Sequence, residues 1–267
     1  MNNNTTIDNS ILSLILTPPS YRTFQNNLSN YDPLDLYQMR NSYLIKFYKN
    51  LEDDLYNLFK NLLEKFCINS DLKIRSLIKI LLEALCTIDN NFAKNIAEDF
   101  CGSKIMEIKM IGLTSCIKYN HSNSIKLLEK FYSEFQNDKI ALEKWFQIRS
   151  SYNNSYFDGI NSIKDILKNK NFEYKNPNFV RAIFSSFQGN NIELFHAKDG
   201  SGYKFVTDQI IIIDKINPQT AARIITPMTN ISKFNDITKN RIKRYLKKII
   251  NSNPSNDVFE VISKALS

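Results

Sequence analysis

The chain contains two histidines, His121 and His196, and this small number limits the hydrolytic chemistry open to it. A zinc hydrolase of the H-E-x-x-H type needs two histidines one helical turn apart and a glutamate that acts as general base. The two histidines here are widely separated, so the motif is absent. We expect His121, which lies in a polar turn between two predicted helices, to be solvated. We expect His196, which precedes an acidic turn, to make a structural hydrogen bond.

No nucleophile elbow, P-loop or dinucleotide-binding fingerprint occurs in the sequence either. A glycine pair does precede a predicted helix in Asp199-Gly200-Ser201-Gly202-Tyr203. Backbone N–H groups at a helix N-terminus can bind a phosphate, but no Lys-Ser/Thr pair follows and no βαβ unit surrounds the loop. We interpret the segment as a tight turn in which Ser201 caps the next helix. We therefore predict no catalytic residue and no metal ligand in this chain.

The four cysteines, Cys67, Cys86, Cys101 and Cys116, show no metal-ligand spacing such as C-x-x-C. All four lie among apolar residues of predicted helices. This pattern is typical of reduced core cysteines in a cytoplasmic protein.

Composition favours a globular helical protein. Of the 267 residues 43% are hydrophobic and 23% are charged, with 6 glycines and 7 prolines, which are few for the frequent turns of a β-sandwich or barrel. No apolar run approaches the length of a membrane-spanning helix, so we expect no membrane partner.

The formal net charge is +8, which could indicate a nucleic-acid partner. It could equally reflect a composition rich in Asn, Lys and Ile. Basic residues form one real run, Lys239 to Lys248, and a helix would present most of them to solvent. We do not expect nucleic-acid binding.

Helices follow one another along the whole chain. Asp32-Pro33, Asn176-Pro177 and Asn217-Pro218 each combine a capping side chain with a proline, which fits the first helical turn because it lacks an N–H group. Apolar residues from Leu44 to Phe66 recur at alternating four- and three-residue spacing and predict one long helix. Ile210 to Ile213 could form a strand, but the flanking apolar positions favour a helix.

The remaining pattern predicts a short helix at Asn9–Leu16 and many helices of similar length. None of them could bury its apolar face alone, so the fold class predicted is all-α, an irregular superhelical array of helical hairpins of the HEAT or armadillo type. Further helices are predicted at residues 71–87, 90–101, 104–119, 122–136, 138–150, 156–168, 177–187, 203–216, 218–229, 235–250 and 256–265.

Four short elements stand in order in the last ninety or so residues: Asn176-Pro177-Asn178-x-x-Arg181, Phe195-His196-x-x-Asp199-Gly200-Ser201-Gly202-Tyr203, Asn217-Pro218-Gln219-x-Ala221-x-Arg223 and Ile262-x-Lys264-Ala265-Leu266. This segment resembles the C-terminal domain of bacterial aminopeptidase N, the alanyl aminopeptidase of the gluzincin zinc metallopeptidases. Looser similarity lies upstream, in Leu16-Thr17-Pro18-Pro19-Ser20 and Lys144-Trp145-Phe146, while the N-M-T-D-like turn usual in the family is absent near residues 104–112.

The resemblance implies a role within a larger enzyme. Residues 1–17 would be a tail and short helix at the junction with a preceding domain, and residues 18–267 the helical C-terminal domain. In the family this domain covers the active-site cleft, closes an internal chamber and gates the entry of peptides. Its partners would be the catalytic and β domains of the same enzyme and the peptide substrates. The zinc ion and its ligands belong to the parent enzyme outside this chain, which we expect to be inactive alone.

Arg181 and Arg223 match family positions that face the chamber. A guanidinium there could bind a peptide carbonyl or a C-terminal carboxylate through parallel hydrogen bonds. Each arginine could instead hold a helix C-terminus or an acidic side chain within the array. The alternative to the whole assignment is a stand-alone helical-repeat adaptor that binds a protein or nucleic acid.

Overall fold

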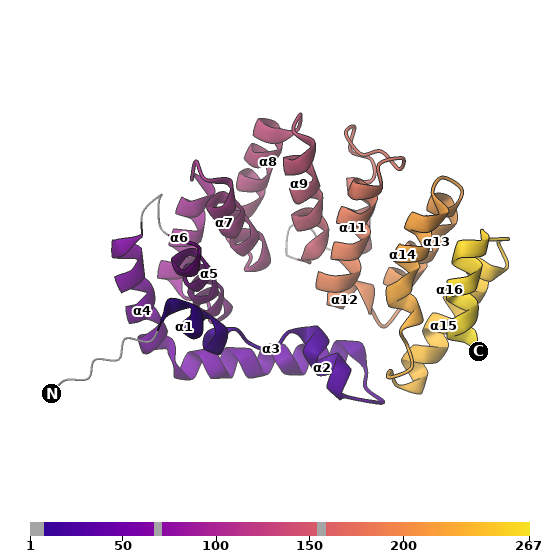
Figure 1. The fold of residues 1–267 in the computed structure, drawn as a ribbon, viewed down its shortest axis with the longest axis horizontal. Coiled ribbons are helices and arrows are strands. Elements are labelled where there is room, and N and C mark those ends of the chain that lie inside the picture. Colours follow the sequence, from indigo (N-terminus) through magenta and orange to yellow (C-terminus); the bar gives the residue numbers. More distant parts are fainter. Residues whose placement is uncertain (1–7, 67–70, 154–158) are drawn as a thin grey trace. The chain divides into compact units, whose positions relative to one another are not determined.

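The computed structural model describes residues 8–66, 71–153 and 159–267 (Figure 1). Within these ranges the chain forms sixteen helices and no β-strand, with one isolated bridge between Tyr31 and Phe234. The prediction of an all-α fold is confirmed. The helices are α1 (Asn9–Leu16), α2 (Tyr21–Asn27), α3 (Pro33–Asn50), α4 (Glu52–Lys65), α5 (Leu72–Thr87), α6 (Asn91–Cys101), α7 (Met106–Lys118), α8 (Ser124–Phe135), α9 (Lys139–Ser151), α10 (Gly159–Ile166), α11 (Pro177–Asn190), α12 (Ile192–Phe195), α13 (Ser201–Asp214), α14 (Pro218–Thr229), α15 (Asp236–Ile250) and α16 (Asn256–Leu266).

Most helix boundaries agree with the sequence pattern to within a few residues, and residues 210–213 are helical, as predicted. Two short helices, α2 and α12, were not predicted. No described helix combines the length and the low polarity that crossing a lipid bilayer would require.

The long helix predicted across residues 44–66 is wrong, because the chain breaks at Leu51 into α3 and α4. Leu51 has φ −112° and ψ 11°, outside the helical range. The first turn of α4 holds three acidic residues, which the positive end of the helix dipole favours. One of them, Glu52, forms an ion pair at 2.6 Å with Lys49 in the last turn of α3. The apolar spacing continues across the break because only one residue leaves the helix.

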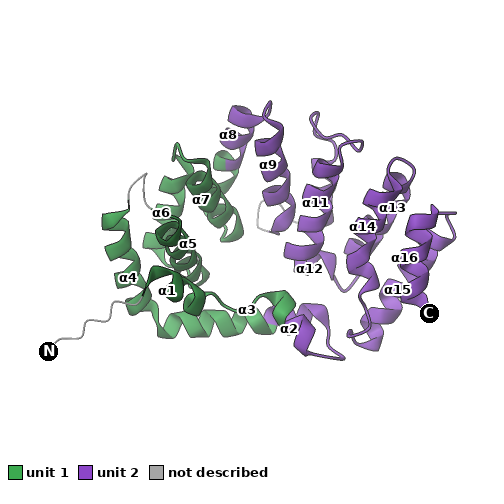
Figure 2. Cartoon of the chain, in the orientation of Figure 1, with its two compact units in different colours: residues 1–23, 39–127 green, residues 24–38, 128–267 purple. Residues whose placement is uncertain are grey.

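The contacts divide the chain into two compact units: unit 1, residues 1–23 and 39–127, and unit 2, residues 24–38 and 128–267 (Figure 2). In unit 1, α6 and α7 form a closely packed hairpin, and α5 contacts α1, α4, α6 and α7. Its core is mainly aliphatic and includes Leu77, Leu81, Leu85 and Phe59, all of them fully buried. The predicted boundary at residue 17 stays a prediction, although α1 packs on α5 within unit 1.

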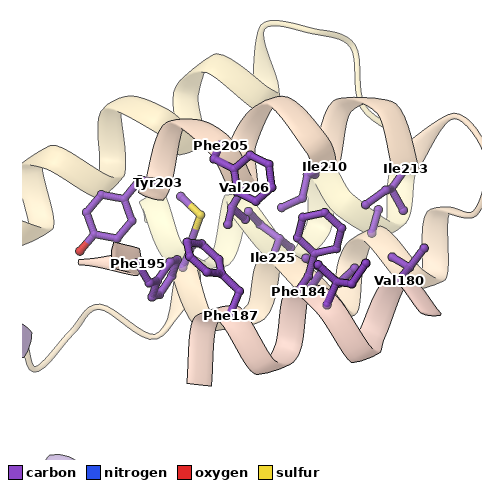
Figure 3. Close-up of a cluster of buried hydrophobic side chains, with 14 of the residues drawn as sticks. Val180, Phe184, Phe187, Phe195, Tyr203, Phe205, Val206, Ile210, Ile213 and Ile225 are labelled. Carbon is purple, nitrogen blue, oxygen red and sulfur yellow. The ribbon is translucent and has the colours of Figure 1, made fainter. Parts of the chain in front are cut away.

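Unit 2 holds a core that is rich in aromatic side chains. The helices in contact include the pairs α9–α11, α13–α14, α11–α14 and α14–α16. Phe184 of α11 stacks on Phe205 of α13 with ring centroids 5.7 Å apart, and Phe187 meets Phe205 edge to face (Figure 3). Burial of each such side chain contributes about 1.5–3 kcal/mol. The segment that resembles the peptidase family is therefore the packed centre of this unit.

Residues 31 and 32 are hydrogen-bonded to the start of α15 and to the segment before it. The backbone of Tyr31 exchanges hydrogen bonds with Lys233 and Asn235 (3.2 and 2.8 Å). Asp32 accepts from the Leu34 N–H (2.9 Å) and from the Thr238 hydroxyl (3.0 Å). Partial burial would raise the pKa of Asp32, but these hydrogen bonds outweigh it and lower the pKa. The Asp-Pro cap of α3 is thus also a tertiary contact of unit 2.

Asp214, at the end of α13, is a buried carboxylate that serves the N-terminus of α16. Its oxygens accept hydrogen bonds from the N–H (2.8 Å) and hydroxyl groups of Ser255, the N-cap residue of α16. We expect Asp214→Ala to lower the free energy of unfolding by about 1–3 kcal/mol, because two partly buried donors of Ser255 lose their acceptor. The exposed Asp236→Ala should cost less than about 1 kcal/mol. Urea unfolding followed by circular dichroism measures both, and equal effects would contradict a special role for Asp214.

Candidate functional site

The first candidate arginine lies one turn inside α11. Asn176 caps this helix by accepting from the N–H groups of Asn178 and Phe179 (3.0 and 3.4 Å), and Pro177 occupies its first turn. Arg181 is partly exposed, and its Nε donates to the Pro177 carbonyl at 3.2 Å while an Nη donates to the Asn178 side chain. The guanidinium therefore folds back along the first turn of its own helix.

The second candidate arginine also lies about one turn inside its helix, α14, although it follows Pro218 by five residues where Arg181 follows Pro177 by four. Asn217 caps this helix through the Thr220 N–H (2.9 Å), and Pro218 follows it. Ala221 is fully buried in the core of unit 2, whereas Arg223 is exposed and no described residue pairs with it. The small side chain allows close packing of α14 while Arg223 stays on the solvent face.

Arg181 and Arg223 lie on two helices, α11 and α14, that are in contact. Gln188, buried on α11, donates to the carbonyl of Ile224, the neighbour of Arg223, at 3.1 Å. Gln188 lies about two turns, or about 10 Å of helical rise, beyond Arg181. The structure thus places the arginines on adjacent helices with an offset along α11. Whether they line a common chamber stays a prediction.

The glycine-containing loop before α13 is a tight turn, as predicted. The prediction that Ser201 caps the helix is wrong. Gly200 is the cap residue, with φ +76° in the left-handed region that favours glycine. The side chain of Asp199 accepts from the Ser201 N–H at 2.9 Å, so the aspartate supplies the bond expected of the serine. The lowered pKa of Asp199 follows first from this bond.

Gly202 marks a close approach of two backbones. A Cβ atom at this position would lie 2.2 Å from the Leu194 carbonyl oxygen and 2.5 Å from that of Phe195. The first turn of α13 therefore contacts α12 directly. Backbone geometry therefore accounts for both glycines of the loop without a bound phosphate.

His196 makes the structural hydrogen bond expected of it, and its partner is Tyr203. The Nδ1 atom of the ring lies 2.6 Å from the tyrosine hydroxyl, and both side chains are buried. Burial lowers the pKa of His196 from 6.5 to about 3, although Asp32 nearby acts in the opposite direction. Burial likewise raises the pKa of Tyr203. The pair is neutral and packed against Phe195 and Phe234.

His121 is not solvated, contrary to expectation. Its side chain is 10% exposed, its Nε2 lies 3.2 Å from a carboxylate oxygen of Glu98, and its Nδ1 accepts from the Asn123 N–H. The described residues contain no group of three or more His, Cys, Asp or Glu side chains that could hold a metal ion. They therefore do not fit a zinc ion, which the family resemblance places in another part of the parent enzyme. Cys67 lies outside the described residues.

The basic run lies on α15 and is partly neutralised. Lys248 pairs with Asp208 at 2.7 Å and Lys239 with Asp236 at 3.5 Å. Arg244 and Lys247 are exposed. This arrangement is typical of a solvated helix face.

Helical hairpins packed through apolar faces, with no strand in the described chain, define a helical-repeat domain of the ARM type. The chain belongs to the family described as "Domain of unknown function (DUF3458_C) ARM repeats", whose pattern matches residues 1–267.

Sequence relatives are enzymes much longer than this chain. It is 35% identical over 141 residues to aminopeptidase N of Haemophilus influenzae and 32% identical over 142 residues to that of Caulobacter vibrioides. These matches cover 52% and 53% of this chain but 16% of each relative. The resemblance to aminopeptidase N is thereby confirmed.

A solved structure extends the similarity over nearly the whole chain. Aminopeptidase A of Legionella pneumophila, crystallised in complex with aspartic acid, matches 98% of this chain with a TM-score of 0.85 and 26% identity. The match covers 32% of that protein. The chain therefore corresponds to a helical domain of an aminopeptidase.

The Gly202 contact predicts a large difference between two glycine variants. Gly202→Ala should destabilise the protein by about 1–3 kcal/mol, because the carbonyls of α12 cannot accommodate a methyl group without a backbone shift. Gly189→Ala on α11, where a Cβ would meet nothing within 4 Å, should be neutral or stabilise by up to about 1 kcal/mol. Thermal and urea unfolding measure the stability of both variants. An unchanged stability of Gly202→Ala would refute the close contact.

The buried His196 predicts a loss of stability on acidification. The unfolded chain takes up a proton near pH 6.5, whereas the folded chain resists protonation down to about pH 3. Between these values the unfolded state binds more protons, so the free energy of unfolding decreases as the pH is lowered. At pH 5 the contribution of His196 to this decrease is about 2 kcal/mol relative to neutral pH. Urea titrations from pH 7.5 to pH 5 measure the slope, above the range in which carboxylates titrate.

His196→Gln removes the titrating group and should flatten this slope, whereas His121→Gln should retain it. An unchanged slope in His196→Gln would show that another group is responsible.

Proposed function

We propose that this chain is the helical domain of a zinc aminopeptidase, and that it covers the active-site cleft and gates the access of peptides. The observation that carries the proposal is the structural match to Legionella pneumophila aminopeptidase A, which spans 98% of this chain. That the matched half of the chain covers only 16% of each aminopeptidase N relative supports a role as one part of a larger enzyme. Its partners would be the catalytic and β domains of that enzyme, in the cytoplasm.

The chemistry of the reaction supports a place for Arg181 and Arg223 in such a chamber. An aminopeptidase holds the free amine of its substrate near the metal, so the rest of the peptide extends away from the zinc ion. Arg223 is exposed and has no described partner, and Arg181 uses only local hydrogen bonds. Both guanidinium groups can therefore donate to peptide carbonyls or to a terminal carboxylate without breaking a tertiary contact.

Substitution of these arginines in the full-length enzyme tests the site. Arg181→Ala or Arg223→Ala should lower kcat/KM for peptides by a factor corresponding to about 1–3 kcal/mol, because one charge-assisted contact is lost. Small aminoacyl amides, which are too short to reach this domain, should be cleaved at an unchanged rate. Steady-state kinetics with a tetrapeptide and an aminoacyl amide measures the two effects.

Arg244→Ala is a matched control, because Arg244 is also exposed and its Nε also donates to a carbonyl of its own helix, that of Asn240. The Arg244→Ala substitution should leave kcat/KM unchanged for both the tetrapeptide and the aminoacyl amide. Equal losses on both substrates, or loss of folding, would show that Arg181 and Arg223 are structural.

The purified chain alone should not hydrolyse peptides. The described residues hold no metal-binding group, and the sequence has no H-E-x-x-H motif. An aminoacyl-amide assay with added zinc measures this, with the full-length enzyme as positive control. Turnover that co-purifies with the chain through successive columns would overturn the assignment.

The alternative of a stand-alone adaptor has the exposed basic residues of α15 as its support. Salt-dependent binding of RNA or DNA, lost on substitution of Arg244 and Lys247, would favour that function. Salt-insensitive, negligible binding would favour the aminopeptidase domain.

A further inference from the structure

Two cysteine sulfurs lie in contact inside unit 1. The Sγ atoms of Cys101, the last residue of α6, and Cys116, near the end of α7, are 3.9 Å apart. Both residues are free thiols in this structure. A disulfide bond is about 2.05 Å long, so the sulfurs need to approach by about 2 Å, which a rotation about χ1 of a cysteine can supply.

The sulfurs are close because α6 and α7 touch at Gly112. A Cβ atom on Gly112 would lie 2.5 Å from the Ala97 carbonyl oxygen and 2.8 Å from the Cys101 backbone nitrogen. Cys116 follows Gly112 by one helical turn on the same face of α7. The Cys101 thiol points back toward this crossing and donates to the Ala97 carbonyl at 3.3 Å. Packing of the hairpin therefore holds the two thiols together.

The two thiols differ in their access to solvent. Cys116 is 1% exposed, and the hydrogen bond with Cys101 and then burial raise its pKa. Cys101 is only partly buried, so a small oxidant can reach it first. Cys86, at 3% exposed, has a pKa raised to about 12 by burial. Cys101 is thus the accessible member of a pair whose second member is protected.

We propose that Cys101 and Cys116 form an oxidation site, which a peroxide converts to an intramolecular disulfide that joins α6 to α7. The sulfur of Cys101, after losing its proton, attacks a peroxide oxygen; an S–O bond forms and the O–O bond breaks, which releases water and leaves a sulfenic acid. The sulfur of Cys116 then attacks that of Cys101. The S–S bond forms, the S–O bond breaks, and the departing hydroxide takes the Cys116 proton as a second water. Two thiols lose two electrons, and the peroxide gains them.

Thiol counting in the intact chain tests the site. Hydrogen peroxide should reduce the number of free thiols, assayed after denaturation, from the four cysteines of the sequence to two, and dithiothreitol should restore them. Peptide mapping without reduction should recover residues 101 and 116 in one cross-linked fragment. The Cys86→Ser variant should also lose the thiols of residues 101 and 116 on treatment with peroxide, because Cys86 takes no part in the disulfide.

Single variants separate the two steps. In Cys116→Ser the reaction should stop at the Cys101 sulfenic acid, which dimedone traps, and in Cys101→Ser the remaining thiols should survive. The proposal is overturned if the wild-type chain forms a disulfide through Cys67 or with a second molecule. It is also overturned if Cys101 is oxidised to the sulfinic acid while Cys116 stays a free thiol. Both outcomes are read from the wild-type chain and do not depend on the folding of a variant.

Discussion

Burial of each helix's apolar face against its neighbours is the interaction on which the rest of this structure depends. Most of the described helices are shorter than about 15 residues, a length at which an isolated helix is at best marginally stable in water. In unit 2 the side chains of α11, α13 and α14 fill one core, in which Phe184, Phe187 and Phe205 are in mutual contact or share a neighbour (Figure 3). This core fixes α11 and α14 and leaves their solvent faces free to carry arginines.

Polar side chains inside the array form hydrogen bonds between helices. Gln188 joins α11 to α14 through the Ile224 carbonyl, and Asp214 joins α13 to the N-terminus of α16. Each joins a side chain of one helix to the backbone of another, so its loss removes a contact between helices.

Several features of the fold could be read from the sequence because local chemistry alone determines them. An Asx-Pro pair favours a helix start through its own side chain and ring, and the helices at Pro33, Pro177 and Pro218 begin where those pairs predict, whereas Asn253-Pro254 starts no helix. Other features depend on contacts distant in the sequence. The environment of His121 is set by Glu98, and the break at Leu51 leaves the apolar spacing unchanged. Neither has a signal in hydrophobic periodicity, although the change from Lys49 to three acidic residues does mark the break.

The sequence by itself determined the all-α class, most helices and the kinship with aminopeptidase N, because periodicity, caps and short motifs are local properties. Only the tertiary structure decided which side chains meet. It paired His196 with Tyr203, assigned the cap of α13 to Gly200 and brought Cys101 within 3.9 Å of Cys116. The physical reason is that such contacts depend on how closely two helices approach. That distance is set by glycines, such as Gly112 and Gly202, whose significance appears only when the opposing backbone is known.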